Sequence, residues 1–342
     1  MRAFAYARAT TPEDAVKAAA DGAAIIAGGT ELLNWMRLGI ADADKVIDIG
    51  RLDGLRAITR HEDGLRIGAR ATLNEIGTSE AVLRAAPVLA QACLKAASAQ
   101  LRNRATIGGN VLQKTRCPYF RAEAPATSAM PWPCNKRVAG SGCAAKDSGY
   151  GRLALFGWTD DCAATQPSDP AVALAVLNAT VEVIGAGGAR GIAMTDFHLT
   201  QAEAAQTASA QHPATLENRL RSDELIVAFH VPVDAAAGRS AYVKVRERES
   251  YEYAMVSAAA AVDLDRQRIR SARIALGSIA QKPWRLTDAE AGLIGQSLDP
   301  AALDKALEAG LASARPPGGN AFKVKLARNA ARRALMIAGT MA

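Results

Sequence analysis

Two glycine pairs, each beside an apolar segment, place the strongest constraint on the first half of the chain. Gly28 and Gly29 stand in AIIAGGTELL, between a predicted strand and a predicted helix, and Gly108 and Gly109 stand in TIGGNVL. Glycine permits positive φ and has no Cβ, so the backbone N–H groups of such turns can approach a ligand. A helix that follows adds positive potential for an anion such as a pyrophosphate. One such pair most often indicates a plain tight turn, whereas two favour a grip on an extended, phosphate-bearing cofactor.

A serine–aspartate pair adds polar groups to these turns. Ser168 and Asp169, in PSDPAVAL, supply a hydroxyl and a carboxylate. These groups suit hydrogen bonds to a ribose, a ribityl chain or a ring, and they equally suit the N-cap of a helix. Neither glycine pair matches GxGxxG or GxxxxGK[ST], so the sequence supports neither a Rossmann fold nor a P-loop.

The composition is typical of a soluble globular protein. The chain has 342 residues, of which 49% are hydrophobic and 22% are charged, so we expect two or three domains. The net charge is +7, but the basic residues are dispersed and aromatic residues make up only 5%, which argues against nucleic-acid binding. We expect no membrane span, because no run of 18 apolar residues occurs. The N-terminus carries acids early and no apolar signal core, so we expect no export signal of its own.

Apolar periodicity and turn residues predict an α+β fold in two parts. The first part covers residues 1–222, with subdomains at about 1–55 and 56–222, and includes a helix across residues 83–99 and a Thr72–Glu75 capping box. The second part covers residues 223–342, where strands precede helices. Its strands are predicted at residues 224–232, 240–248, 254–264 and 268–278, and its helices at 287–294, 300–314 and 320–338.

Residues 114–165 interrupt the first part. They are rich in proline, glycine and basic residues, and a structureless segment of this length in a compact domain needs something to order it. Zinc sites usually show close C-x2–4-C pairs, which are absent from this sequence, and disulfides cannot be paired from sequence. A [4Fe–4S] cluster needs four thiolates and tolerates wide spacing. The segment contains Cys117, Cys134, Cys143 and Cys162, spaced C-x16-C-x8-C-x18-C, whereas Cys93 lies in a predicted apolar helix and suggests core packing.

Basic residues near these cysteines favour the cluster. A cluster ligated by four thiolates is anionic, and nearby cations would offset its charge. Glycines in the segment permit the turns that a wrapped cluster requires. The basic residues in question are Lys114, Arg116, Arg121, Lys136 and Arg137.

Four motifs resemble a known family over essentially the whole chain: AGGTELL, TIGGN, PSD and YVKVRERESYEYAMVSAAAAV. They are similar to the FAD-binding subunit of the molybdenum hydroxylases, a family that includes xanthine dehydrogenase, carbon monoxide dehydrogenase and aldehyde oxidoreductases. The resemblance implies an α+β fold with a two-part FAD-binding domain of the vanillyl-alcohol-oxidase (PCMH) type, an iron–sulfur insertion at 114–165, and a small α+β C-terminal domain of the CO-dehydrogenase flavoprotein type.

The resemblance also implies how FAD is held. The two turns would bind the pyrophosphate and neighbouring groups, and Asp169 would meet the adenosine or ribityl side. Leu225 or Ile226 would lie near the flavin ring with Lys244, whose charge would favour the reduced flavin; Tyr251 and Tyr253 are further candidates to approach the ring. The implied cofactor-binding residues are Ala27, Gly28, Gly29, Thr30, Glu31, Leu32, Thr106, Gly108, Gly109, Asn110, Ser168, Asp169, Ile226 and Lys244.

The cysteine segment resembles one branch of this family. TRCPYFR, PCNKR, GSGCAA and DDCAATQPSD are similar to the iron–sulfur insertion in the flavin subunit of bacterial aldehyde oxidoreductases of the periplasmic, heterotrimeric type. The resemblance implies that Cys117, Cys134, Cys143 and Cys162 bind a [4Fe–4S] cluster. It places this chain either in the periplasm, by co-export with a signal-bearing partner, or in the cytoplasm.

The function that this resemblance implies is electron transfer. A large subunit with a molybdenum cofactor would oxidise an aldehyde, a small subunit would carry the electrons through [2Fe–2S] clusters, and FAD in this chain would pass them to an external acceptor. No general base is visible here, so we assign no catalytic residue. The alternatives are a subunit of a xanthine dehydrogenase-like or other heterocycle hydroxylase, a stand-alone FAD oxidase, and a non-redox module held by zinc.

Overall fold

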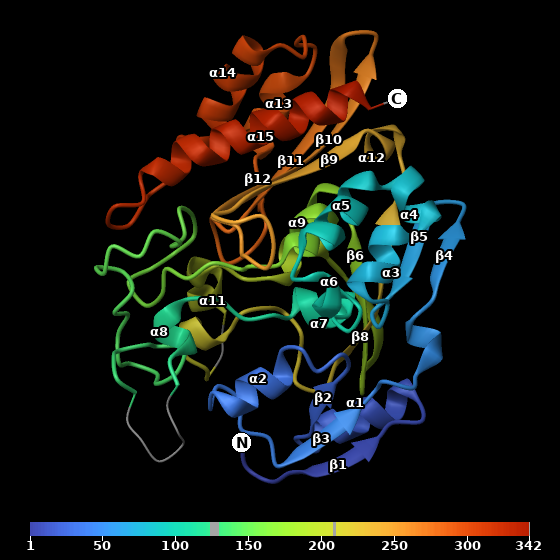
Figure 1. Ribbon diagram of the computed structural model, residues 1–342, viewed down its shortest axis with the longest axis vertical. Helices are drawn as coiled ribbons and strands as arrows, with labels where there is room; N and C mark the ends of the chain where they lie inside the picture. Colours follow the sequence, from blue (N-terminus) through green and yellow to red (C-terminus); the bar gives the residue numbers. More distant parts are fainter. Residues whose placement is uncertain (124–129, 208–209, 342) are drawn as a thin grey trace.

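The computed structural model describes residues 1–123, 130–207 and 210–341, and these residues form three β-sheets with helices between and around them (Figure 1). The N-terminal sheet is parallel, in the order β1-β3-β2. Parallel neighbours need crossover connections, which two helices supply. These elements are β1 (Ala5–Arg8), α1 (Pro12–Ala20), β2 (Ala24–Ile26), α2 (Leu32–Arg37) and β3 (Lys45–Asp48).

The second sheet is antiparallel, five-stranded and central to the molecule. Its order is β4-β5-β8-β6-β7, so the strand latest in sequence lies in the middle. The strands are β4 (Ile58–His61), β5 (Gly64–Gly68), β6 (Thr180–Gly185), β7 (Gly188–Ala193) and β8 (Leu225–Pro232).

Strand β8 lies beyond the domain boundary that we predicted between residues 222 and 223. It is nonetheless hydrogen-bonded to β5 on one side and to β6 on the other. The five-stranded sheet therefore extends past that boundary to Pro232, and the change of sheet falls between β8 and the next strand at Ser240.

Helices surround this sheet and fill the space between it and the C-terminal part. We predicted one helix over residues 83–99, but the structure has two, because Ala86 adopts φ −150° and ψ 61° directly before Pro87. The elements are η1 (Asp53–Leu55), α3 (Leu73–Thr78), α4 (Glu80–Ala85), α5 (Pro87–Lys95), α6 (Ala99–Arg102), α7 (Ile107–Val111), α9 (Asp169–Val176), α10 (Met194–Phe197), α11 (Gln201–Gln206) and η2 (Pro213–Thr215).

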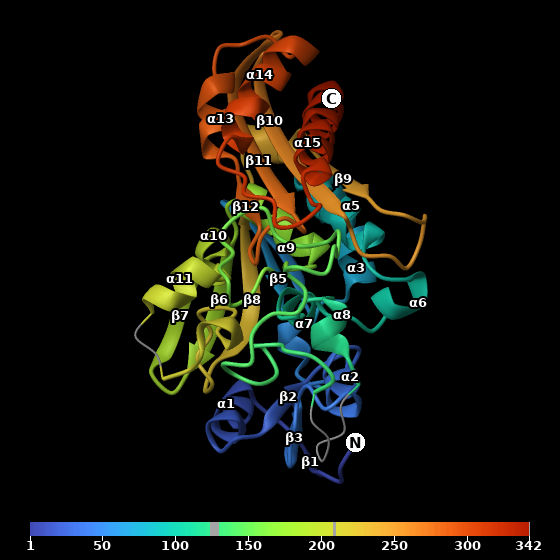
Figure 2. The same ribbon diagram turned by 90° about the vertical axis from the view of Figure 1, so that its left-hand side faces the viewer.

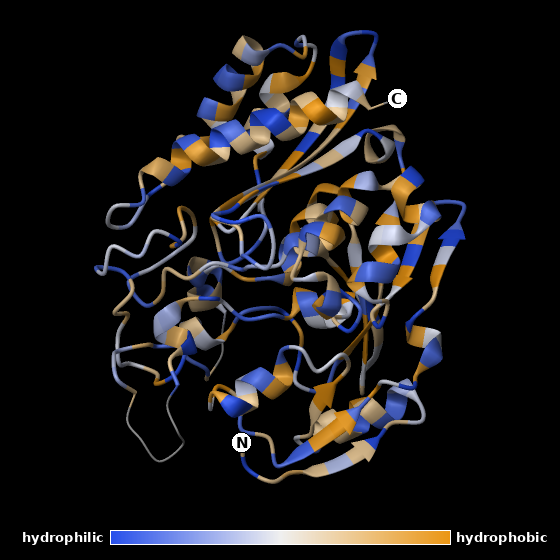
Figure 3. Ribbon diagram, in the orientation of Figure 1, coloured by the Kyte–Doolittle hydropathy of each residue, from blue (hydrophilic) through white to orange (hydrophobic). Residues whose placement is uncertain are grey.

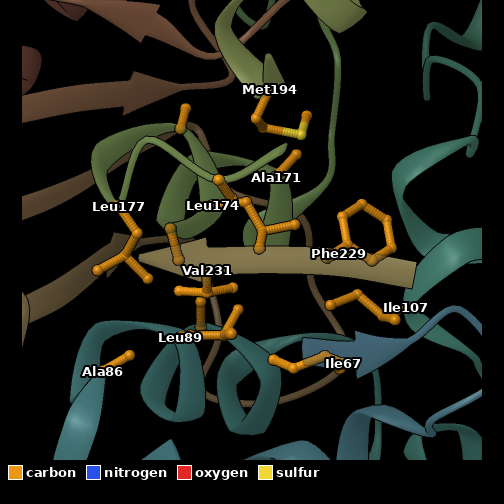
Figure 4. Packing of buried hydrophobic residues seen from close by; sticks show 14 of the residues in the cluster. Ile67, Ala86, Leu89, Ile107, Ala171, Leu174, Leu177, Met194, Phe229 and Val231 are labelled. Carbon is orange, nitrogen blue, oxygen red and sulfur yellow. The ribbon is translucent and has the colours of Figure 1, made fainter. Parts of the chain in front are cut away.

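The main core packs against β8. In Figure 4, Phe229 and Val231 of β8 lie among side chains from β5, α5 and α9, namely Ile67, Leu89 and Leu174, and all five are buried. Cys93 is fully buried in the same cluster, which confirms its predicted packing role. Burial raises the pKa of its thiol, so it behaves as a small apolar side chain.

The C-terminal part is a four-stranded antiparallel sheet with helices on one face (Figure 2). Alternate residues of its strand β10 enter different cores: Ala259 and Ala261 join the main core, whereas Ala258 and Ala260 join the C-terminal core. A period of two explains this alternation, and burial on both faces explains the continuous apolar run. The elements are α12 (Ala235–Gly238), β9 (Ser240–Val245), β10 (Val256–Asp265), β11 (Arg268–Gly277), β12 (Trp284–Arg285), α13 (Thr287–Leu293), α14 (Pro300–Leu311) and α15 (Phe322–Thr340).

Helix α15 alternates hydrophobic and hydrophilic residues along its length (Figure 3). Its buried side chains recur at intervals of three and four residues, as in Ala327, Ala331, Ala334 and Ala338, which turns one stripe toward β9 and β10. No helix in the described part of the chain is long and apolar enough to cross a bilayer.

The predicted insertion, residues 114–165, has little regular structure in its described residues. It contains the short helix α8 (Pro118–Arg121) and two isolated bridges, one between Cys134 and Cys143 and one between Thr159 and Cys162. Residues 124–129, which belong to the predicted insertion, lie outside the described residues. Side-chain contacts to distant segments, described below, hold this part of the chain.

Candidate functional site

A cleft is lined by residues of the N-terminal sheet, of the central sheet and of the insertion. It encloses about 1210 Å³, including its solvent-open side. Residues of both glycine segments line it, so one extended ligand can contact both of them. All the predicted cofactor-binding residues except Ser168 and Lys244 line it.

The first glycine pair follows β2 directly and joins it to α2. A Cβ on Gly28 would lie 1.9 Å from the Arg104 carbonyl oxygen, so this glycine is required by the backbone of the neighbouring segment. Gly29 has φ +74°, a conformation that side chains disfavour. The two glycines are therefore needed for close backbone packing beside the cleft as well as for access to the cleft. The sequence alone did not indicate this packing.

We predicted that the second glycine pair forms a turn. The structure instead places this pair in helix α7. Thr106 is its N-cap, with Oγ1 accepting a hydrogen bond from the Gly109 N–H at 3.3 Å. A Cβ on Gly108 would lie 3.1 Å from both the Cβ and the carbonyl oxygen of Ala69, which leaves little room for a larger residue. The small residues let this helix pack tightly against the central sheet while it lines the cleft.

Ser168 links this helix to α9. Its hydroxyl donates to Asn110 Oδ1 at 2.7 Å and accepts from the Ala171 N–H at 3.1 Å, so Ser168 is the N-cap of α9. Of the two roles that the sequence left open, the structure shows the capping role. Ser168 lies behind the cleft and fixes Asn110, which lines it.

Asp169 forms a buried polar cluster with two residues of β9. Its Oδ1 accepts from the Tyr242 hydroxyl at 2.5 Å, and its Oδ2 accepts from Lys244 Nζ at 2.7 Å. The side chains of Asp169 and Lys244 are 5% and 2% exposed. Burial, and secondarily the negative charge of Asp169, raises the pKa of Tyr242 well above its ordinary value. Lys244 contacts the cleft through Asp169 and itself lines a neighbouring basic cavity with Arg246.

Glu31 fastens the first glycine segment to the insertion. Its carboxylate accepts from Arg116, from Arg121 at 3.1 Å and from the Trp35 indole at 2.8 Å. Two guanidinium groups thus neutralise the one carboxylate in this wall of the cleft, which reduces its repulsion of a phosphate. We predicted that these arginines offset the negative charge of the cysteines. No local pattern in the sequence indicates that they pair with a residue some 90 positions earlier.

Arg116 also stacks on Tyr253. Its guanidinium carbon lies 4.4 Å from the centre of the Tyr253 ring, and both residues line the cleft. Burial raises the pKa of Tyr253 to about 12, so the phenol stays neutral. Tyr251, the other tyrosine that we considered, is 58% exposed.

The four predicted cluster cysteines line one small cavity, hereafter the four-cysteine cavity. Backbone N–H groups point at three of the sulfurs: Cys117 accepts from Tyr119 and Phe120, Cys134 from Lys136 and Arg137, and Cys162 from Ala164. Burial raises the pKa of all three thiols, and these backbone donors offset part of that rise. All four cysteines are free, and among the described residues no three His, Cys, Asp or Glu side chains are grouped to hold a metal ion.

The predicted charge compensation around the cysteines is largely absent. Arg116 and Arg121 pair with Glu31, and Arg137 donates to the carbonyl oxygens of Phe120 and Ala122. Lys136 alone of the five predicted cations lines the four-cysteine cavity. Sequence proximity was a poor guide because the side chains reach in other directions.

The chain's relationships agree with the fold and the cleft. The sequence model described as the FAD binding domain in molybdopterin dehydrogenase matches residues 2–234, and the CO dehydrogenase flavoprotein C-terminal domain matches residues 240–338. The chain therefore belongs to the family of FAD-binding subunits of molybdopterin dehydrogenases. It is an FAD-binding subunit of the oxidoreductase type, with a mixed α/β FAD-binding domain followed by the C-terminal domain.

Individual relatives carry this further. The chain is 41% identical over 335 residues to the aldehyde oxidoreductase FAD-binding subunit PaoB of Escherichia coli strain K12, covering 96% of each chain. It is 25% identical to the glyceraldehyde dehydrogenase medium chain of Sulfolobus acidocaldarius, over 86% of this chain and 83% of the relative. The solved carbon monoxide dehydrogenase of Hydrogenophaga pseudoflava has the same fold, with a TM-score of 0.74, 24% identity and coverage of 99% and 98%.

Proposed function

We propose that this chain is the electron-transfer flavoprotein subunit of a molybdenum-dependent aldehyde oxidoreductase. The observation that carries the proposal is the 41% identity, over nearly the full length of both chains, to an aldehyde oxidoreductase FAD-binding subunit. A glyceraldehyde dehydrogenase medium chain, also named for an aldehyde, is 25% identical, and the relatives named for xanthine or carbon monoxide share only 24–27% identity. Aldehyde is therefore favoured over a heterocycle as the substrate class of the complex.

We assign the cleft to FAD. The backbone of residues 27–31 and 106–110 would hold the pyrophosphate and neighbouring groups, with Glu31 neutralised by its two arginines. Ile226 and the Arg116–Tyr253 stack would border the flavin ring. FAD supplies a centre that accepts electrons singly and releases them singly or in pairs.

Lys244 would act on FAD through Asp169. Its ammonium fixes the orientation of the Asp169 carboxylate, which lines the cleft and can accept a hydrogen bond from a ribityl or ribose hydroxyl. The buried pair stabilises this geometry because neither partner can rotate away into water.

The four-cysteine cavity is our proposed [4Fe–4S] site. Support comes from the donor set: four free cysteines around one cavity, three of them accepting backbone N–H bonds. In a [4Fe–4S] cluster each thiolate binds a different iron, so the ligands need not converge on one ion as they do around zinc. The cluster would supply one-electron chemistry, and it would also order a segment that has little secondary structure.

The proposed partners follow from the names of the relatives, several of which are medium chains or medium subunits. A large molybdenum-cofactor subunit and a small [2Fe–2S] subunit would form the rest of the complex. FAD here would receive electrons from the [2Fe–2S] clusters and pass them to an external acceptor. We further propose that the complex resides in the periplasm by co-export with a signal-bearing partner, or else in the cytoplasm.

The test is a spectroscopic and metal analysis of the complex purified with its co-expressed partners. We expect one FAD per copy of this chain, iron beyond that of the [2Fe–2S] subunit, and aldehyde oxidation. Activity of the isolated chain would favour a stand-alone FAD oxidase, and zinc without iron or flavin would favour the non-redox alternative. Turnover of xanthine but not of aldehydes would reassign the substrate class.

A further inference from the structure

Three charged side chains behind the four-cysteine cavity form a chain of ion pairs, hereafter the lysine–glutamate triad. Lys136 Nζ lies 2.8 Å from Glu217 Oε1, and Lys114 pairs with the other oxygen of the same carboxylate. Two lysines therefore share one carboxylate, and the triad carries one net positive charge. Burial alone would raise the pKa of Glu217, but the two lysines outweigh burial and lower it to about 2, so the carboxylate is ionised.

The inner member of the triad is fixed beside the cysteines. The side chain of Lys136 is 5% exposed and lines the four-cysteine cavity. Its ammonium donates to the Ala214 carbonyl at 2.7 Å as well as to Glu217, and both acceptors come from the loop before β8. Among the contacts described, these two use two of the three N–H groups of the ammonium, which leaves one donor for the cavity.

The charge of the triad has a consequence for what the cavity holds. The buried ammonium of Lys136 is costly unless negative groups lie near it, and one side of it faces the cavity. The sulfurs of Cys134 and Cys162 lie within electrostatic reach of Lys136. Arg116, Arg121 and Arg137 bind other groups. Of the five basic residues predicted near the cysteines, Lys136 is the one that lines the four-cysteine cavity.

We propose that Lys136 is a positioning residue that sets the reduction potential of a thiolate-ligated cluster in the four-cysteine cavity. The proposal rests on the proposed function, because it requires that the four cysteines hold a [4Fe–4S] cluster. Reduction adds one electron, so a fixed positive charge favours the reduced form and raises the potential. Glu217 holds the ammonium in place and at the same time offsets part of its charge.

This arrangement predicts opposite signs for two substitutions in the triad. Lys136→Met removes the positive charge and should lower the equilibrium constant for reduction about tenfold, which is 59 mV for one electron. Glu217→Gln removes the negative charge and should raise it. Lys136→Arg keeps the charge and should stay near the wild type. Lys146→Met is the matched control, because Lys146 belongs to the same insertion but does not line the four-cysteine cavity, and it pairs with Asp160, which is 88% exposed.

The measurement is a dithionite titration of the purified complex followed by electron paramagnetic resonance, with iron and flavin counted for every variant. A wild-type complex without the cluster would overturn the proposed cofactor, a failure distinct from that of this inference. Bound iron with shifts of the same sign in Lys136→Met and Glu217→Gln, or with shifts no larger than that of Lys146→Met, would refute the role of Lys136.

A further variant covers the case in which the substitutions of Lys136 and Glu217 prevent cluster assembly. Lys114 is the outer lysine, 31% exposed, so Lys114→Met removes the same charge at a less buried position. We expect a smaller fall in the reduction equilibrium than for Lys136→Met. Loss of iron in Lys136→Met, Glu217→Gln and Lys114→Met alike would show a structural role alone and would overturn the proposal.

Discussion

The cleft and the cysteine insertion are adjacent in sequence but are built differently. Two helices of the cleft are capped locally, α7 by Thr106 and α9 by Ser168, beside the long-range pair of Asp169 with Lys244. The insertion depends on long-range ion pairs, such as Arg116 with Glu31, 85 residues apart, and Lys136 with Glu217, 81 residues apart. Local hydrogen bonds form whenever the helices form, whereas long-range pairs need the rest of the fold in place. The insertion should therefore be the part most dependent on its proposed metal.

Replacing Cys134 by serine should separate the two regions most completely. The backbone of Cys134 forms an isolated β-bridge with Cys143, and Cys134 lines the four-cysteine cavity. Its replacement removes one of the four proposed ligands. We expect iron of the [4Fe–4S] type to fall to background and proteolysis within residues 114–165 to increase, while the FAD content is retained. Iron analysis, flavin absorbance and limited proteolysis of the complex are the measurements.

Cys93→Ala is the matched control for this experiment, since Cys93 is also buried but lies in the main core. It should keep its iron and lose some thermal stability. Simultaneous loss of iron and FAD in Cys134→Ser would show that the cleft and the insertion form one cooperative unit. The insertion would then depend on the proposed metal no more than the cleft does. Turnover measured on the same samples would separate an electron relay from a structural cluster.

A second substitution tests the buried pair beside the cleft. Asp169→Asn removes the carboxylate and leaves Lys244, 2% exposed, as an uncompensated buried charge. We expect the free energy of unfolding to fall by about 3–5 kcal/mol, with weaker FAD binding. Urea unfolding and flavin titration measure the two effects.

An exposed pair provides the contrast. Asp44 is 83% exposed and pairs with Arg2 at 2.9 Å, so Asp44→Asn should cost less than about 1 kcal/mol. Equal costs at the two sites would mean that water screens the Asp169–Lys244 pair, and the proposal that it fixes the cleft wall would fail.

The same contrast explains what the sequence could predict. The Thr72–Glu75 capping box is confirmed, because it depends on residues three positions apart. The strands around β10 were placed within two or three residues for the same reason. The role of Thr106 as a helix cap was missed because two glycines disfavour a helix, and packing against Ala69 overrides that preference.

For the candidate site, the sequence could indicate which segments meet but not which contacts they make. The two glycine segments and Asp169 do share one cleft. The clamp on Glu31 and the charge on Lys136 could not be foreseen, because each requires a side chain from a segment about 80 or more residues away. Assignments of charge by proximity in sequence failed at Arg116, Arg121 and Arg137 for that reason.

A third substitution tests the backbone packing at the first glycine pair. Gly28→Ala places a Cβ 1.9 Å from the Arg104 carbonyl oxygen, so one of the two backbone segments must move. We expect a loss of about 2–3 kcal/mol in the free energy of unfolding and a lower FAD affinity, with iron unaffected. Gly54→Ala is the control, since a Cβ there has nothing within 4 Å. An unchanged FAD affinity would show that this wall of the cleft tolerates displacement.

The smallest expected effect concerns Lys323, which ties the end of the insertion to the C-terminal part. Its fully buried ammonium donates to the Leu153 carbonyl at 2.8 Å and to the Ser278 carbonyl at 2.7 Å. Burial, and secondarily the charge of Arg152, lowers its pKa to about 7. Between this value and its ordinary pKa of 10.5, the unfolded chain binds a proton that the folded chain releases, so stability rises with pH across that window.

From pH 7 to pH 8 this linkage amounts to about 1 kcal/mol in the free energy of unfolding, whereas below pH 7 both states are protonated and the contribution to the slope vanishes. Lys323→Met should flatten the slope between pH 7 and 8, and Lys325→Met, at an exposed position of the same helix, should not. Urea unfolding at several pH values is the measurement. If Lys323→Met leaves the slope of the free energy of unfolding against pH unchanged, the protonation of Lys323 is not linked to folding.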